Sequence, residues 1–191
     1  LTRKATDRGG GVMGREIRRV PANWQHPMQE CQHSPWRGGC DEAKRNGGKC
    51  YQPLHDQDYE TAAKEWLDGC IAWANKTHED YCEDSPYYWD YAGAPPSEEY
   101  YRPKVDEADR TWVQVYETVS EGTPVTPPFA TKAGLIDYLV AHGDFWDQLQ
   151  GEGGWTRENA ISFVGLEYAP SMVVAVTSEG VKISGPRDGN Q

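Results

Sequence analysis

The chain has 191 residues, a length typical of one domain with a sizeable core, and a formal net charge of −11 from 30 acidic and 19 basic residues. This charge disfavours direct binding to nucleic-acid phosphates or anionic lipid, and it is compatible with a cationic protein partner. The longest apolar stretches, such as residues 172–176, are far shorter than the roughly 20 residues of a membrane-spanning helix, so no membrane association is expected.

Residues 1–12 are basic and have no core-forming apolar pattern. We expect them to be either a disordered tail or a mistranslated upstream region that precedes a natural start at Met13. The second interpretation comes from the run Arg8-Gly9-Gly10-Gly11, whose codons can form a purine-rich ribosome-binding site. Residues 13–191 are then expected to form a single α+β domain.

Residues 24–57 are rich in Gly, Pro, Cys and His and show no period of 2 or 3.6, which predicts a long irregular segment. Four of its residues are of the types that hold tetrahedral zinc: Cys31, His33, Cys40 and Cys50. Their spacing is not that of paired Cys-x-x-Cys ligands, so two interpretations stay open. One is a structural zinc that orders the segment, and the other is a set of free thiols. No other cofactor is expected.

The chain has five cysteines and no apolar signal sequence, which together favour a reducing compartment over a closed disulfide framework. We therefore expect a cytoplasmic protein. Cys70 falls on the apolar face of a predicted helix and is interpreted as a small core residue.

Residues 58–76 are predicted to be a helix, because apolar residues recur at steps of three and four and Asp58 stands at the N-cap position. Residues 78–109 contain ten Asp or Glu residues against one Arg and one Lys, interleaved with seven Tyr or Trp residues. Prolines interrupt this segment, so we expect acidic, aromatic loops there.

Residues 111–183 are predicted to contain a strand, two helices and a terminal hairpin. The strand covers residues 111–119, one helix runs from Thr131 to Gly143, and the other begins at Thr156 and is stopped by Gly165. The resulting fold class is α+β: a small antiparallel sheet packed by about three helices, with a long irregular Cys/His-containing N-terminal segment.

Several motifs along the chain resemble an uncharacterised protein family of tailed bacteriophages and prophages. They are Arg18-Arg19-Val20-Pro21-x-x-Trp24-x-His26-Pro27, Tyr51-x-Pro53-Leu54 before Glu65-Trp66, Pro96-x-x-x-Tyr100-Tyr101-Arg102-Pro103, Tyr116-Glu117-Thr118-Val119-Ser120-Glu121-Gly122-Thr123-Pro124-Val125-Thr126-Pro127, and Ala169-Pro170-Ser171-Met172. The resemblance runs from Met13 to about Val174. It implies a host bacterial cytoplasm as the setting, and it transfers no catalytic residue to this chain.

The sequence favours a non-enzymatic function, because it has no Gly-x-Ser-x-Gly motif and its remaining histidines have no patterned Ser or Cys partner. The first hypothesis is a phage accessory protein that binds a host or phage protein through its acidic, aromatic surface. The alternative is a small zinc-binding enzyme or a metal-stabilised ligand-binding protein that uses the Cys/His segment.

Overall fold

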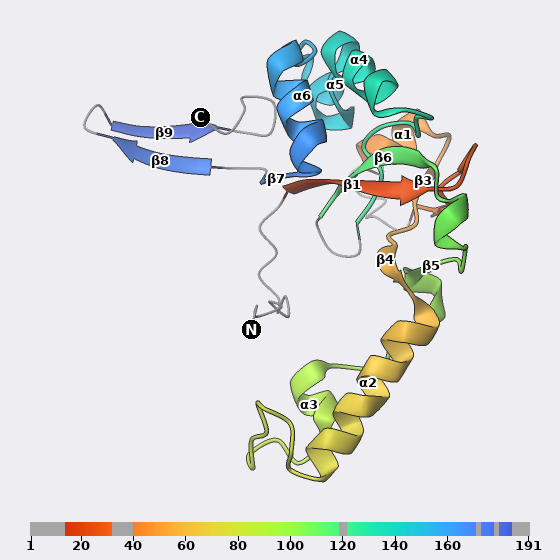
Figure 1. Cartoon of the computed structure of the whole chain (residues 1–191), viewed down its shortest axis with the longest axis vertical. Helices are drawn as coiled ribbons and strands as arrows, with labels where there is room; N and C mark the ends of the chain where they lie inside the picture. The colour runs from red at the N-terminus through yellow and green to blue at the C-terminus, as the bar shows by residue number, and fades with distance from the viewer. Residues whose placement is uncertain (1–13, 32–39, 119–121, 171–172, 178–179, 185–191) are drawn as a thin grey trace. The chain divides into compact units, whose positions relative to one another are not determined.

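The computed structural model describes residues 14–31, 40–118, 122–170, 173–177 and 180–184 (Figure 1). The chain divides into two compact units: a larger unit of Leu1–Pro53 with Val105–Gln191, and a smaller unit of Leu54–Lys104. The predicted α+β class is confirmed, because a small antiparallel sheet is accompanied by several helices. Within the described ranges, no helix combines the length and the apolar character needed to cross a membrane.

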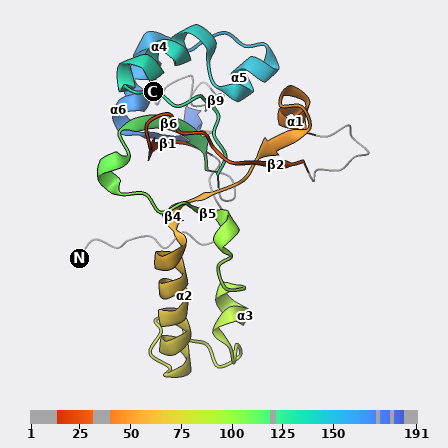
Figure 2. The ribbon, with the colours of Figure 1, turned by 90° about the vertical axis from the view of Figure 1, so that its right-hand side faces the viewer.

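The central sheet of the larger unit has three antiparallel strands in the order β6-β1-β7. Figure 2 shows β1 and β6 side by side. The strands are β1 (Gly14–Val20), β6 (Trp112–Glu117) and β7 (Tyr168–Pro170). In the register, Ile17 of β1 lies opposite Val115, and Arg15 lies opposite Ala169. β6 agrees with the predicted strand over 111–119, whereas β1, the middle strand, was not predicted.

Strand β1 has two buried arginines, each with a partner. Arg15 Nε donates to Asp144 Oδ2 at 2.6 Å, and both side chains are nearly inaccessible to solvent. Arg18 Nε donates to Glu16 Oε1 at 2.6 Å, and its guanidinium lies 4.5 Å from the ring centroid of Tyr116. These ion pairs allow charged residues to occupy the centre of the sheet.

Three helices of the larger unit lie on one side of the sheet in Figure 1. They are α4 (Lys132–His142), α5 (Phe145–Gln150) and α6 (Arg157–Leu166). Leu135 and Leu139 of α4 are fully buried in a core with Val115 of the sheet and Phe163 of α6. The prediction that α4 begins after Thr131 and ends at Gly143 is confirmed, because the Thr131 side chain accepts a hydrogen bond from Gly134 N and Gly143 is the C-cap.

Helix α6 starts after Thr156 as predicted, but it does not stop at Gly165. It continues to Leu166, and Glu167 takes the left-handed conformation with φ of 60°. The Glu167 carboxylate forms an ion pair with Lys132 Nζ at 2.6 Å, which holds this residue at the end of the helix. Helix α5 was not predicted.

The segment over residues 24–57 was predicted to be irregular, and the structure instead has short regular elements in it. They are β2 (Met28–Glu30), α1 (Asp41–Arg45), β3 (Lys49–Tyr51) and β4 (His55–Asp58). β2 and β3 pair antiparallel, with Gln29 opposite Cys50. Elements of three to five residues are too short to show a hydrophobic period.

The smaller unit is built around α2 (Tyr59–Ala74), which confirms the predicted helix over 58–76. The Asp58 side chain caps it by accepting a hydrogen bond from Thr61 N at 2.9 Å. Strand β4 pairs in parallel with β5 (Tyr101–Arg102). The predicted loops over 78–109 contain α3 (Tyr88–Ala92) and the 3₁₀ turns η2 (Glu98–Tyr100) and η3 (Glu107–Asp109).

Near the end of the described chain, β8 (Val173–Thr177) and β9 (Gly180–Ser184) pair antiparallel. This is the predicted terminal hairpin, and it forms a two-stranded sheet of its own.

Candidate functional site

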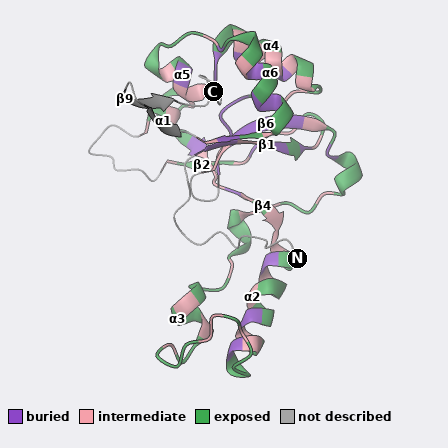
Figure 3. Ribbon diagram, turned by 60° about the vertical axis from the view of Figure 1, so that its left-hand side comes forward, coloured by how far each residue is buried: buried purple, intermediate pink, exposed green. Residues whose placement is uncertain are grey.

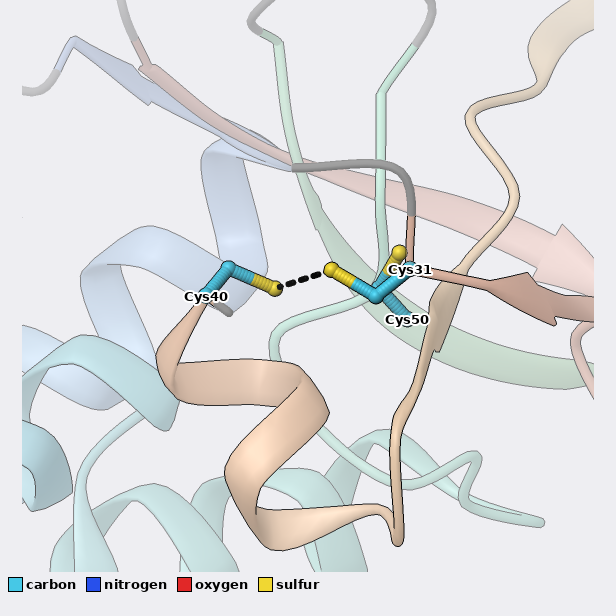
Figure 4. A group of neighbouring side chains, drawn as sticks. All are labelled: Cys31, Cys40 and Cys50. Carbon is cyan, nitrogen blue, oxygen red and sulfur yellow. Dashed lines mark hydrogen bonds between the residues drawn. The ribbon is translucent and has the colours of Figure 1, made fainter. Parts of the chain in front are cut away.

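Three cysteines of the larger unit come together where β2, α1 and β3 meet (Figure 4). Cys31 directly follows β2, Cys50 lies in β3, and Cys40 is the N-cap residue of α1. Antiparallel pairing brings the first two close, and the hydrogen bond from Cys31 N to Gly48 O at 3.1 Å extends this pairing. The sequence-predicted residues Cys31, Cys40 and Cys50 therefore form one cluster.

The distances within this thiol cluster fit a metal site. The Sγ atoms of Cys31 and Cys40 are 3.6 Å apart, and all three Sγ atoms lie within 4.8 Å of one another. Tetrahedral zinc with bonds of about 2.3 Å to sulfur places its ligand atoms about 3.8 Å apart. The three thiols are therefore close enough together to hold one metal ion.

Hydrogen bonds and burial set the chemistry of the thiol cluster. Ala43 N donates to Cys40 Sγ at 3.4 Å, which orients this sulfur. Burial, followed by a hydrogen bond with Cys31, raises the pKa of Cys50 to about 12. Cys50 is therefore protonated at neutral pH without a metal, and an ion must displace its proton to bind.

The fourth predicted ligand, His33, lies outside the described residues. His26, which belongs to the same Cys/His-rich stretch, is buried and engaged elsewhere: its Nε2 is 2.6 Å from Gln52 O and its Nδ1 is 3.0 Å from the Tyr116 hydroxyl. Cys70 and Cys82 lie in the smaller unit and make no such cluster. Among the residues that the structure describes, no second group of three potential metal ligands is gathered in this way.

The larger unit also contains a cavity of about 730 Å³, called here the aromatic pocket. Its walls include the rings of Trp24, Tyr51, Tyr138 and Phe145, each partly buried. This pocket was not predicted from the sequence, because its lining comes from eight separate stretches of the chain.

A hydrogen-bond network lies beneath the aromatic pocket. Trp24 Nε1 donates to the Tyr116 hydroxyl at 3.2 Å, and Gln114 Nε2 donates to Thr126 O at 2.7 Å. Because a carbonyl only accepts, His26 Nε2 has the proton in its contact with Gln52 O. Burial, and to a smaller degree the charge of Arg18, lower the pKa of His26 to about 4, although the bond to Gln52 acts in the opposite direction.

Most of the acidic smaller unit is exposed or half-buried (Figure 3). Its aromatic residues include a cluster around the buried Trp73 and an exposed pair. Trp73 is 2% exposed, and four rings surround it with centroids 4.8–5.8 Å away. These rings are those of His78, Tyr81, Tyr88 and Tyr91. Tyr87 and Trp89 instead stack on each other in an exposed position, with centroids 4.6 Å apart.

Comparison with known proteins finds no match: no protein-family model fits the chain, and neither curated proteins nor solved structures match it. The resemblance to phage proteins thus stays a sequence-based prediction. The features of the molecule that bear on its function are the thiol cluster, the aromatic pocket and the surface of the smaller unit.

Proposed function

We propose that this chain is a non-enzymatic accessory protein that binds another protein through its smaller unit. The observation behind the proposal is the charge of Leu54–Lys104, which has twelve Asp or Glu residues and four Lys or Arg residues. This gives a formal charge of −8, most of the −11 of the whole chain. A surface of this charge attracts a cationic protein and repels nucleic acid and anionic lipid.

Exposed apolar residues in the same unit supply contact area. Leu67 and Ile71 stand one turn apart on α2 and are 55% and 52% exposed. The stacked pair Tyr87 and Trp89 is about half exposed as well. Aromatic and aliphatic anchors among acidic residues combine contact energy with electrostatic selection of the partner.

The proposed setting is the cytoplasm of a bacterium infected by a tailed phage, and the proposed partner is a basic host or phage protein. The support for this setting is the motif resemblance described above, which includes Arg18-Arg19-Val20-Pro21 and its continuation to Pro27.

The test is capture from a bacterial lysate with the full chain, followed by a direct affinity measurement with the purified captured protein. We expect that protein to be basic and to bind more weakly as salt is raised. The double variant Leu67→Ser/Ile71→Ser removes about 1 kcal/mol or more of apolar contact per residue, so its Kd should rise at least about tenfold.

A matched control exists on α6 of the larger unit. Ile161 and Leu166 are the same two residue types and are 52% and 62% exposed. The variant Ile161→Ser/Leu166→Ser should bind with unchanged affinity. Equal losses in both double variants, or a captured partner that is acidic, would contradict the proposal.

A second candidate function, favoured by the thiol cluster, is a metal-stabilised ligand-binding protein with one structural zinc. We propose Cys31, Cys40 and Cys50 as ligands, with His33 as the fourth. Four protein ligands close a zinc site and make it structural, whereas three leave a position for a reactive water.

The zinc proposal is tested by the metal content of the full chain purified without a metal-binding tag. We expect one zinc per chain in the wild type and in Cys82→Ser, whose thiol is exposed, and none in Cys40→Ser. Zinc at one hundred times its Kd should add about 2.7 kcal/mol to the free energy of unfolding, or about 5–11 °C in Tm for a chain of this size. A wild type without bound zinc and without this shift would refute the site.

A further inference from the structure

The aromatic pocket has the size and the surface of a small-molecule site. Its volume of about 730 Å³ falls within the usual range of roughly 300–1,000 Å³ for such sites. The rings of Trp24, Tyr51 and Phe145 line it, and each residue is only partly buried by the rest of the protein. Flat apolar walls of this kind are complementary to an aromatic ring.

The pocket is also held in a fixed shape. Pro124, Pro127 and Pro128 form part of its rim and restrict the backbone there. Val125 between them donates from its N to Val115 O of β6 at 2.9 Å and accepts from Phe145 N at 2.9 Å. A preformed site of this kind loses little conformational entropy when a ligand binds.

The charge of the lining is the opposite of the charge of the chain. Of the residues described around the pocket, none is Asp or Glu, and Arg45 is the one Lys or Arg. The Arg45 guanidinium lies 4.8 Å from the ring centroid of Phe145, which orients it at the pocket while it stays exposed to solvent. The lining therefore has one positive charge and no negative one in a protein of net charge −11.

Arg45 differs from every other arginine that the structure describes. The other six each lie 3.9 Å or less from a carboxylate: Arg15, Arg18, Arg19, Arg102, Arg110 and Arg157. Arg45 has no hydrogen bond or ion pair with any described residue, although acidic residues outnumber basic ones. Its planar set of donors is thus available to an anionic group.

We propose that the aromatic pocket binds a small aromatic molecule with one negatively charged group. Its ring packs against Trp24, Tyr51 and Phe145, and its anionic group accepts hydrogen bonds from the Arg45 guanidinium. This site lies in the larger unit and does not depend on the binding of a protein by the smaller unit.

Two fluorescent dyes with the same ring system test this proposal on the full chain. The anionic probe is 1-anilinonaphthalene-8-sulfonate, and the neutral one is N-phenyl-1-naphthylamine, which lacks the sulfonate. We expect saturable 1:1 binding of the sulfonate dye, with a Kd that rises about tenfold or more in Arg45→Gln. The affinity of the neutral dye should change by less than about twofold in that variant.

Further variants distinguish dye binding at Arg45 from a general effect of removing a charge. Arg45→Lys keeps the charge and should keep most of the affinity, whereas Arg157→Gln, which removes an exposed and paired arginine, should change nothing. The Leu67→Ser/Ile71→Ser variant should bind the dye as the wild type does, so that a failed protein-binding proposal and a failed pocket proposal give different results. Unchanged sulfonate affinity in Arg45→Gln, or the same loss for both dyes, would overturn the inference.

Discussion

The substitution Asp144→Asn isolates the buried ion pair that joins the central sheet to the helices. Asp144 is 2% exposed and accepts from Arg15 Nε at 2.6 Å. The same carboxylate caps α5 by accepting from Trp146 N and Asp147 N. Because Asn caps helices about as well as Asp, the variant keeps the cap and removes the charge.

The expected cost follows from burial. Loss of one charge leaves the Arg15 guanidinium, whose side chain is 10% exposed, without its counter-charge, and breaking a buried pair in this way costs about 3–5 kcal/mol. In a chain of this size that corresponds to a decrease of about 6–20 °C in Tm.

The matched control is Asp137→Asn. Asp137 pairs with Arg157 at the same distance of 2.6 Å, but the two side chains are 64% and 63% exposed. Solvent screens such a pair, so its loss should cost less than about 1 kcal/mol. The distance is equal in the two pairs, and burial alone separates the predictions.

Urea unfolding followed by tryptophan fluorescence measures both variants, with circular dichroism to verify that each folds. A free energy of unfolding that falls equally in Asp144→Asn and Asp137→Asn would refute the argument from burial. So would an Asp144→Asn variant as stable as the wild type.

Two further predictions concern two helical glycines and the buried His26. A Cβ at Gly69 of α2 would overlap the ring of Tyr88, so Gly69→Ala should lower the free energy of unfolding by about 1–3 kcal/mol. A Cβ at Gly165 of α6 would meet open space, so Gly165→Ala should raise the free energy of unfolding by about 0.5–1 kcal/mol. Urea unfolding of both variants checks that one change destabilises the protein and the other stabilises it. The pKa of His26 is lowered to about 4 in the folded protein, whereas it is about 6.5 in the unfolded chain. As the pH falls below about 6.5, His26 is therefore protonated in the unfolded chain before it is protonated in the folded protein, which favours unfolding. The wild type should therefore lose about 3 kcal/mol more than His26→Gln between pH 6.5 and pH 4 in urea titrations, and parallel pH profiles would contradict the assignment of a buried, neutral His26.

The sequence predicted the long helices well, because their signals are local and repeated. Asp58 and Thr131 cap α2 and α4 where they were expected, and the apolar steps of α4 place Leu135 and Leu139 in the core. The central strand β1 was missed for a physical reason. Its buried residues include Arg15, whose burial is compensated by a carboxylate 129 positions further along the chain.

The candidate site was predictable in part. Residue type alone singled out Cys31, Cys40 and Cys50, but their proximity depends on the antiparallel pairing of β2 with β3. A local signal for α1 was present. Cys40 precedes two acidic residues and then Lys44 and Arg45, the charge order that a helix dipole favours. The aromatic pocket has no such signal, because it requires the tertiary fold.

Helix α1 links the thiol cluster to the aromatic pocket, and this gives a reason for the two features to depend on each other. Cys40 caps its N-terminus and Arg45 stands in its last turn. Five residues are too few for a stable helix in water, so contacts with the rest of the protein must hold α1 in place, as the buried Ala43 does. A metal on Cys40 would add a contact at the start of α1, and the contact of Arg45 with the Phe145 ring holds its end.

Removal of the metal should then weaken the binding of the anionic dye. We expect chelation of zinc to raise the Kd of 1-anilinonaphthalene-8-sulfonate several-fold in the wild type, and to change it little in Arg45→Gln, which has already lost the contact that α1 positions. Linkage requires the reverse effect as well, so bound dye should raise the affinity for zinc by the same factor. Dye titrations with and without zinc measure the first effect, and zinc titrations with and without dye measure the second. If the affinity for the dye does not depend on zinc, and that for zinc does not depend on the dye, then α1 keeps its position without the metal. The thiols would then have no part in shaping the pocket.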